Sequence, residues 1–93
     1  MSSSRDFEWD EAKAASNEAK HGVRFDYAAR VFLDGRVVTL DVTQEHQGES
    51  RRKAVGQVDG RIFAVVYTER QGVTRINSAR RCNEKEAKAY GPA

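Results

Sequence analysis

The sequence contains one cysteine, Cys82, and one proline, Pro92. A lone cysteine cannot form an internal disulfide, and His46 lies in a polar segment with no second histidine nearby, so we expect no metal centre and no cofactor. No run approaches the roughly 18 consecutive apolar residues of a membrane helix, and the N-terminal MSSSRDFEW lacks the apolar stretch of a secretory signal. We therefore expect a soluble, cytoplasmic protein that does not associate with membranes.

Charge is nearly balanced over the chain but unevenly distributed along it. Residues 1–43 contain six lysines and arginines against eight acidic residues, a net −2, and residues 44–93 contain ten against six, a net +4. Together the halves give the formal net charge of +2. A basic second half is typical of a surface that binds a polyanion, although so small a difference also arises by chance.

The length of 93 residues, with 39% hydrophobic content, suits a single domain over residues 1–93, because so short a chain cannot divide its apolar residues between two cores. We expect residues 1–5 to be disordered. Asp10 is a candidate helix N-cap and Gly22 a candidate C-cap around an Ala-, Lys- and Glu-rich segment. This pattern predicts a first helix over roughly 11–20.

A second helical stripe follows in residues 25–32, where apolar side chains recur at i, i+3, i+4 and i+7. After Gly35 the period changes to strand-like alternation, and two Gly-containing turns separate the later runs. Strands are predicted at 38–42, 51–58, 61–70 and 73–81, and a capped helix at 84–90. We expect an α+β fold with two N-terminal helices, a four-stranded antiparallel sheet and a C-terminal helix.

The segment INSARRCNEKE, residues 76–86, places Arg80 and Arg81 at a strand end directly before a helix. Backbone N–H groups at a helix start favour an anion, and arginine forks match phosphate oxygens, so this corner is a candidate phosphate site. The structural alternative is that these arginines pair with the nearby Glu84 and Glu86. In an uninterrupted strand, one face would carry Arg75, Asn77 and Arg81, and the other Thr74, Ile76, Ser78 and Arg80.

Other polar residues have both a functional and a structural interpretation. Glu49 and Arg51 are two positions apart and would share a strand face, as a proton-transfer group and its electrostatic partner or as a surface ion pair. Lys20 and His21 end the first predicted helix, where the helix dipole alone explains them. Tyr67 lies in an apolar strand, so its hydroxyl needs a partner.

Several segments together resemble the BrnT family of type II toxin–antitoxin toxins, small ribonucleases of the RelE-like fold class. The matching segments are FEWDEAKAASNEAKHGVRF (7–25), VFLDG (31–35), GES-R…G (48–56), VVYTER (65–70) and RINSARRCNEKEAKAY (75–90). The sequence departs from the family pattern at Arg52 and Lys53, where apolar strand residues are usual, at Asn77, where an aliphatic residue is usual, and at Arg24, where serine is frequent.

The resemblance implies an endoribonuclease that inhibits translation and growth until a cognate antitoxin binds it. The antitoxin is expected to be BrnA-like, of the ribbon-helix-helix type, and operator DNA would be bound only through the antitoxin complex. The polar positions that match are Lys20, His21, Glu49, Arg51, Tyr67, Glu69, Arg70, Arg75, Ser78, Arg80 and Arg81.

RNA contains its own nucleophile, so such an enzyme needs no metal to orient the 2′-hydroxyl, move its proton and neutralise the phosphorane. On this interpretation Arg80 and Arg51 stabilise charge, Glu49 or His21 is the base, and Tyr67 or protonated His21 is the acid. Residues expected to contact RNA are Lys20, Arg70, Arg75, Ser78 and Arg81. The alternative is a non-catalytic nucleic-acid-binding or antitoxin-scaffolding module, which would bind RNA without cutting it.

Overall fold

The computed structural model describes residues 6–43 and 50–91, so the expectation for residues 1–5 lies outside the described part of the chain. The elements are β1 (Asp6–Glu8), α1 (Glu11–His21), α2 (Phe25–Ala28), the 3-10 helix η1 (Ala29–Leu33), β2 (Val38–Asp41), β3 (Arg52–Val58), β4 (Arg61–Arg70), β5 (Val73–Arg81) and α3 (Glu84–Tyr90). None of the described helices is long and apolar enough to cross a membrane.

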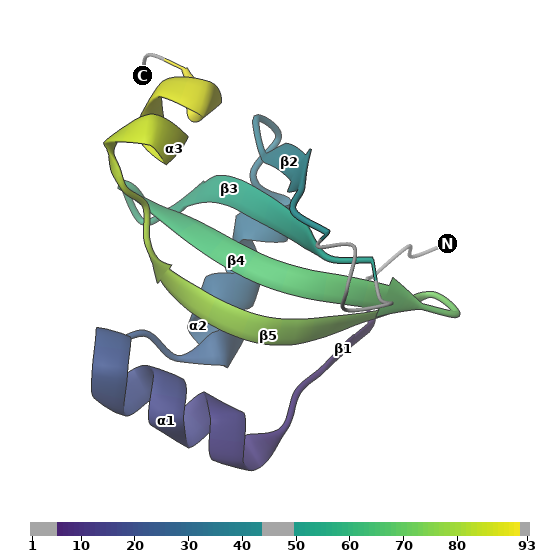
Figure 1. The fold of residues 1–93 in the computed structure, drawn as a ribbon. Coiled ribbons are helices and arrows are strands. Elements are labelled where there is room, and N and C mark those ends of the chain that lie inside the picture. The colour runs from purple at the N-terminus through teal and green to yellow at the C-terminus, as the bar shows by residue number, and fades with distance from the viewer. Residues whose placement is uncertain (1–5, 44–49, 92–93) are drawn as a thin grey trace.

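The strands form one five-stranded sheet in the order β1-β5-β4-β3-β2, with β4 in the middle (Figure 1). Strands β2 to β5 pair antiparallel, as the sequence predicts. The expected four-stranded antiparallel sheet is nevertheless wrong, because β1 adds a fifth strand that runs parallel to β5. Three residues are too few to show an alternating pattern, and their partners lie more than sixty positions away in the sequence.

The predicted pair of N-terminal helices also needs correction. The first is present as α1, with Asp10 accepting a hydrogen bond from Lys13 N at its start and Gly22 in the left-handed conformation at its end. The second is a single α-helical turn, α2, that continues as η1. A 3-10 helix has three residues per turn, so Ala28 and Val31 point the same way, and both are fully buried.

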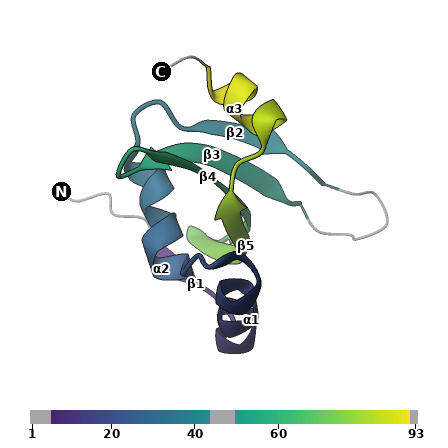
Figure 2. The same ribbon diagram turned by 90° about the vertical axis from the view of Figure 1, so that its left-hand side faces the viewer.

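The main core lies between the sheet and the N-terminal helical segments. Figure 2 shows α2 on one side of the sheet and α3 near the top of the picture, away from α2. Phe25, Val31 and Ile76 are among the largest fully buried side chains of this core. A smaller cluster of Val55, Ala64 and Tyr90 forms where α3 packs against the other face of the sheet. The two faces are therefore covered unequally.

Asn17 fixes α1 to the sheet. Its Nδ2 donates to the carbonyl oxygen of Ala79 at 2.7 Å and to that of Val23 at 3.0 Å, and its Oδ1 accepts from Ala79 N at 3.1 Å. Strand β1 pairs with β5 only as far as Arg75, so beyond that residue this edge of β5 has no strand neighbour. The Asn17 amide satisfies the Ala79 peptide group as a neighbouring strand would, and holds it directly before Arg80.

Candidate functional site

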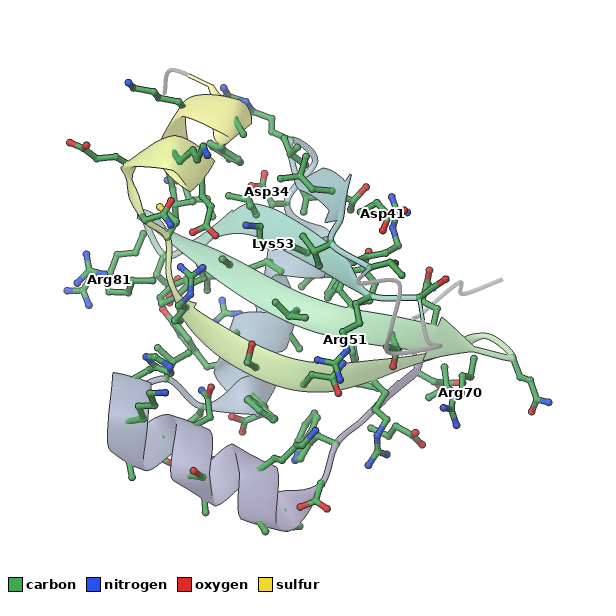
Figure 3. The ribbon with its side chains drawn as sticks, in the orientation of Figure 1. Asp34, Asp41, Arg51, Lys53, Arg70 and Arg81 are labelled. Carbon is green, nitrogen blue, oxygen red and sulfur yellow. The ribbon has the colours of Figure 1, made fainter. Side chains whose placement is uncertain are left out.

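The side of the sheet opposite α1 and α2 carries a group of cationic and polar side chains, and we call this side the open face. Lys53 and Ser78 lie on either side of Val66, and Arg80 lies beside Ala64 in the next row. Figure 3 shows Lys53 and Arg51 on this same side of the sheet, with α2 behind the strands. Strands β3 and β5 therefore bring cations to both sides of β4.

Glu86, from the first turn of α3, connects two of these cations. Arg80 donates to both carboxylate oxygens of Glu86, at 2.8 and 2.7 Å, and Lys53 Nζ donates to Oε2 at 2.7 Å. The Glu86 side chain is only 3% exposed, whereas Lys53 is 19% and Arg80 37% exposed. Glu86 also closes a capping box with Asn83, which fixes the start of α3 over the sheet.

These contacts determine the charge state of Glu86. Burial raises the pKa of its carboxyl, but hydrogen bonds from Arg80, from Lys53 and from Asn83 N lower it by more, and the pKa falls from 4.5 to about 2. The hydrogen bond to Glu86 in turn raises the pKa of Arg80 above its ordinary value. Both side chains are therefore charged at neutral pH, and the pairing expected as the structural alternative for Arg80 is confirmed.

In the described part of the chain, three buried polar atoms at this site have no hydrogen-bond partner: Arg51 Nε, Thr68 Oγ1 and Asn77 Nδ2. They come from three adjacent segments of the chain: Arg51 directly precedes β3, Thr68 follows Tyr67 in β4, and Asn77 follows Ile76, the partner of Tyr67 in β5. Buried polar atoms are rarely left unpaired in native proteins, so a cluster of them indicates a place where a polar ligand or water binds. Two of the three atoms are N–H donors, which suits an acceptor such as a phosphate oxygen.

A β-bulge in β5 brings more of the predicted residues to the open face than the sequence suggests. The register slips between Val66 and Tyr67, so Ile76 and Ala79 both pack into the main core although two residues separate them. Asn77 and Ser78, between them, both lie toward the open face. The expected alternation is therefore wrong from Ser78 onward, since a bulge inserts one unpaired residue and reverses the facing of all that follow.

The bulge exchanges the faces that strand alternation predicts for Arg80 and Arg81, the two arginines of the candidate phosphate corner. Arg80 lies on the open face, and Arg81 points to the side of the helices, where it lines a groove together with His21. Arg75 shares the open face with Ser78 and Arg80, and its Nη1 donates to Glu8 Oε2 at 3.0 Å. The structure thus groups Arg51, Ser78, Arg75 and Arg80 on one face, and places Arg81 apart from them.

The other predicted site residues lie away from this group. Tyr67 is 2% exposed, and its ring packs edge-on against Phe32 at 5.0 Å in the main core. Lys20 and His21 are exposed at the end of α1. Figure 3 shows Arg70 at the end of the sheet opposite to Arg81. Glu49 lies outside the described residues.

Sequence reasoning missed Lys53 and Thr68 as site residues, and considered Glu86 only as a partner of the arginines. Lys53 was noted as a departure from the apolar pattern of its strand, and that departure was the available signal, because a half-buried lysine requires an anionic partner. The partner, Glu86, lies 33 residues further along the chain, at a position that also serves as the third helical residue of a capping box. The sequence offered Glu86 as a partner of the arginines, but it gave no sign of the contact with Lys53.

Among the residues that the structure describes, no group of three or more His, Cys, Asp or Glu side chains is placed to hold a metal ion. The candidate site is therefore a cationic surface with buried donors that have no partner among the described residues. A family model described as the ribonuclease toxin BrnT of a type II toxin–antitoxin system matches residues 9–86.

The chain belongs to the BrnT family. The match begins at Trp9, directly after β1, ends at Glu86 in the first turn of α3, and includes Lys53 and the open-face residues of β5. Comparison with the curated proteins finds no match. The family consists of ribonuclease toxins of type II toxin–antitoxin systems, so this chain belongs to a class of proteins that act on RNA and are paired with an antitoxin.

Proposed function

We propose that this BrnT protein is an endoribonuclease that cleaves RNA without a metal ion, with the scissile phosphate bound on the open face. The 2′-oxygen attacks the adjacent phosphorus, so the O2′–P bond forms as the P–O5′ bond breaks. The 2′ proton passes to a base, and the departing 5′-oxygen receives a proton. The products are a 2′,3′-cyclic phosphate end and a 5′-hydroxyl end.

The observation that carries this proposal is the set of unpaired buried donors beside a cluster of cations. Among the described residues, Arg51 Nε and Asn77 Nδ2 have no hydrogen-bond partner, and Lys53 and Arg80 share the single carboxylate of Glu86. Preorganised donors and cations stabilise the extra negative charge of a phosphorane more than that of the ground-state phosphate. The electrostatic arrangement suits this reaction.

The cations have different roles in the proposal. Arg80 and Lys53 are held by Glu86, so this carboxylate is a positioning residue that aligns both of them at the edge of the site. Arg51 forms no ion pair with the described residues, and its guanidinium is available to the phosphorane oxygens. Ser78 adds a hydroxyl on the same face, and Arg75 contacts a flanking phosphate. Glu49, two positions before Arg51, is the proposed base.

The antitoxin that the family implies would act by covering these cations. We propose that it belongs to the ribbon-helix-helix type and that operator DNA is bound through it. A toxin without its antitoxin would then cut RNA and inhibit translation, and the complex would not.

Arg51→Ala provides the sharpest test, because Arg51 forms no ion pair with a described residue whose loss would perturb the fold. Removing one donor to a developing oxyanion lowers the rate by about 100-fold to 1000-fold, and we expect a loss of that size in RNA cleavage. Arg52→Ala is the matched control: it removes the same charge one residue away, from a side chain that donates to Thr39 on the opposite face. Equal cleavage by both variants would disprove the role of Arg51. RNA that is retained but never cut would favour the non-catalytic binding module.

A further inference from the structure

A second basic site lies behind the open face, at the end of the sheet where β4 begins and β5 ends. It is a groove of about 420 Å³ between the end of α1 and the sheet, and we call it the end groove. Its lining includes His21, Arg24, Tyr27, Arg61, Phe63 and Arg81. The proposed reaction uses none of the cations in it, so the end groove requires its own explanation.

The cations of the end groove are only partly neutralised. Arg24 forms a two-pronged pair with Asp26, at 3.1 and 3.0 Å, and the nearby Asp59 contacts Arg30 at 3.5 Å. Arg61 and Arg81 form no ion pair with any residue that the structure describes, although both are exposed. Two free guanidinium groups and an imidazole that converge on one groove favour an anionic ligand.

The end groove and the open face are linked in the chain where Arg80 is followed by Arg81. Arg80 and Arg81 are consecutive, so their Cα atoms are about 3.8 Å apart, and they point to opposite sides of the sheet. One polyanion chain that passes the end of β5 can therefore contact Arg80 on one side and Arg81 with Arg61 on the other. A small anion would contact only one side of the sheet, so its affinity would not increase because Arg80 and Arg81 are adjacent.

The lining of the groove also favours a phosphate chain over a protein segment. Protein interfaces rely on apolar and aromatic anchors, but Phe63 is only 4% exposed, and Leu33, an exposed large apolar side chain, lies outside the groove. The volume is at the lower end of the range for ligand sites and suits about one nucleotide. The groove thus offers charge and little apolar surface.

We infer that the end groove binds the phosphate backbone of the RNA segment that flanks the cleaved bond, through Arg61, Arg81 and His21. The inference rests on the proposed ribonuclease function and extends it. A substrate long enough to reach around the sheet end binds at both sites, whereas a very short substrate binds at the open face alone. The end groove consequently sets a minimum length for tight binding.

Arg61→Ala tests this, with Lys13→Ala as the matched control, because Lys13 is an exposed cation at the distant start of α1. Binding is measured by fluorescence anisotropy with 2′-O-methyl RNAs of 12 and 3 nucleotides, which cannot be cleaved by 2′-hydroxyl attack. We expect Arg61→Ala to weaken binding of the 12-mer by about fivefold to tenfold and to lower the salt slope by about 0.7, as the loss of one phosphate contact requires. Binding of the 3-mer and all binding by Lys13→Ala should stay unchanged.

Other outcomes separate this inference from the proposed function. If wild-type protein cuts RNA but Arg61→Ala binds the 12-mer as tightly as Lys13→Ala does, the end groove is not an RNA subsite and the open-face proposal stands. If a 12-residue polyglutamate displaces the 12-mer at equal concentration from wild type but not from Arg61→Ala, the groove is an acidic-peptide site and the RNA assignment is overturned. If wild type binds neither RNA, both proposals fail.

Discussion

The Glu86 cluster allows a quantitative prediction about stability. Each pKa unit corresponds to about 1.4 kcal/mol, so a fall in the Glu86 pKa from 4.5 to about 2 corresponds to about 3 kcal/mol of the free energy of unfolding. Glu86→Gln removes the negative charge and replaces one carboxylate oxygen with an NH₂ group; if this group takes the place of Oε1, it cannot accept from Arg80 Nη1 and Asn83 N. We expect this variant to lose about 3 kcal/mol at pH 7, as is typical when one partner of a buried ion pair is removed.

The stability lost in Glu86→Gln should depend on pH, because it comes from the charge of the Glu86 carboxylate. The folded-state pKa lies below the unfolded-state value, so the stabilisation is fully present above pH 4.5 and is lost as the pH falls toward 2. The difference between wild type and Glu86→Gln should shrink from about 3 kcal/mol at pH 7 to about 1.5 kcal/mol at pH 3. Urea unfolding at pH 7, 5, 4 and 3 measures it.

Glu84→Gln is the control, because Glu84 lies in the same first turn of α3 but is exposed. Its effect should stay within about 0.5 kcal/mol at every pH, as is usual for exposed positions. The reasoning would be refuted if Glu86→Gln were as stable as Glu84→Gln at pH 7, or if its deficit were the same at pH 3 as at pH 7.

Two further predictions concern the scaffold that positions the site. Asn17→Ala removes three buried hydrogen bonds and leaves the Ala79 peptide group unsatisfied, so we expect a loss of about 3 kcal/mol and a fall in Tm of roughly 10–20 °C. Ser16→Ala, on the exposed side of the same helix, should leave Tm nearly unchanged, and equal effects of the two substitutions would rule out the clamp. Gly56→Ala would place a Cβ 2.9 Å from both Cβ and O of Val31, so it should cost about 1–3 kcal/mol in thermal unfolding, and an unchanged Tm would contradict this close packing.

Much of the fold could be predicted because it is encoded locally. The caps at Asp10 and Gly22 and the capping box at Asn83 are present as expected. The turns at Asp59-Gly60 and Gln71-Gly72 have positive φ at both residues, as tight hairpins between twisted strands require. Each of these signals lies within a few residues of the element that it specifies.

The features that could not be predicted depend on contacts between distant segments. Strand β1 is recognisable only from its pairing with β5, and the bulge at Asn77 only from the register against β4. Neither leaves a periodic pattern in its own segment. The bulge also places Arg80 rather than Arg81 on the same face as Arg75, so the arrangement of the site depends on the least predictable element.

Of the predicted site residues, those before the bulge could be assigned a side of the sheet from their strand position, whereas Ser78, Arg80 and Arg81 could not. The structure adds Lys53 and Glu86 to the open face, where both contact each other and Glu86 also contacts Arg80. The roles of Glu49, His21 and Tyr67 in proton transfer stay predictions.

The most direct test of the central claim is the chemistry of the RNA ends. Purified protein is incubated with a defined RNA in EDTA, alone and with ribosomes, and the products are mapped by their termini. We predict discrete cuts that leave 2′,3′-cyclic phosphate and 5′-hydroxyl ends, formed by wild type and by Arg52→Ala but not by Arg51→Ala. Intact RNA under both conditions, or cuts that leave 3′-hydroxyl ends, would contradict metal-independent cleavage on the open face.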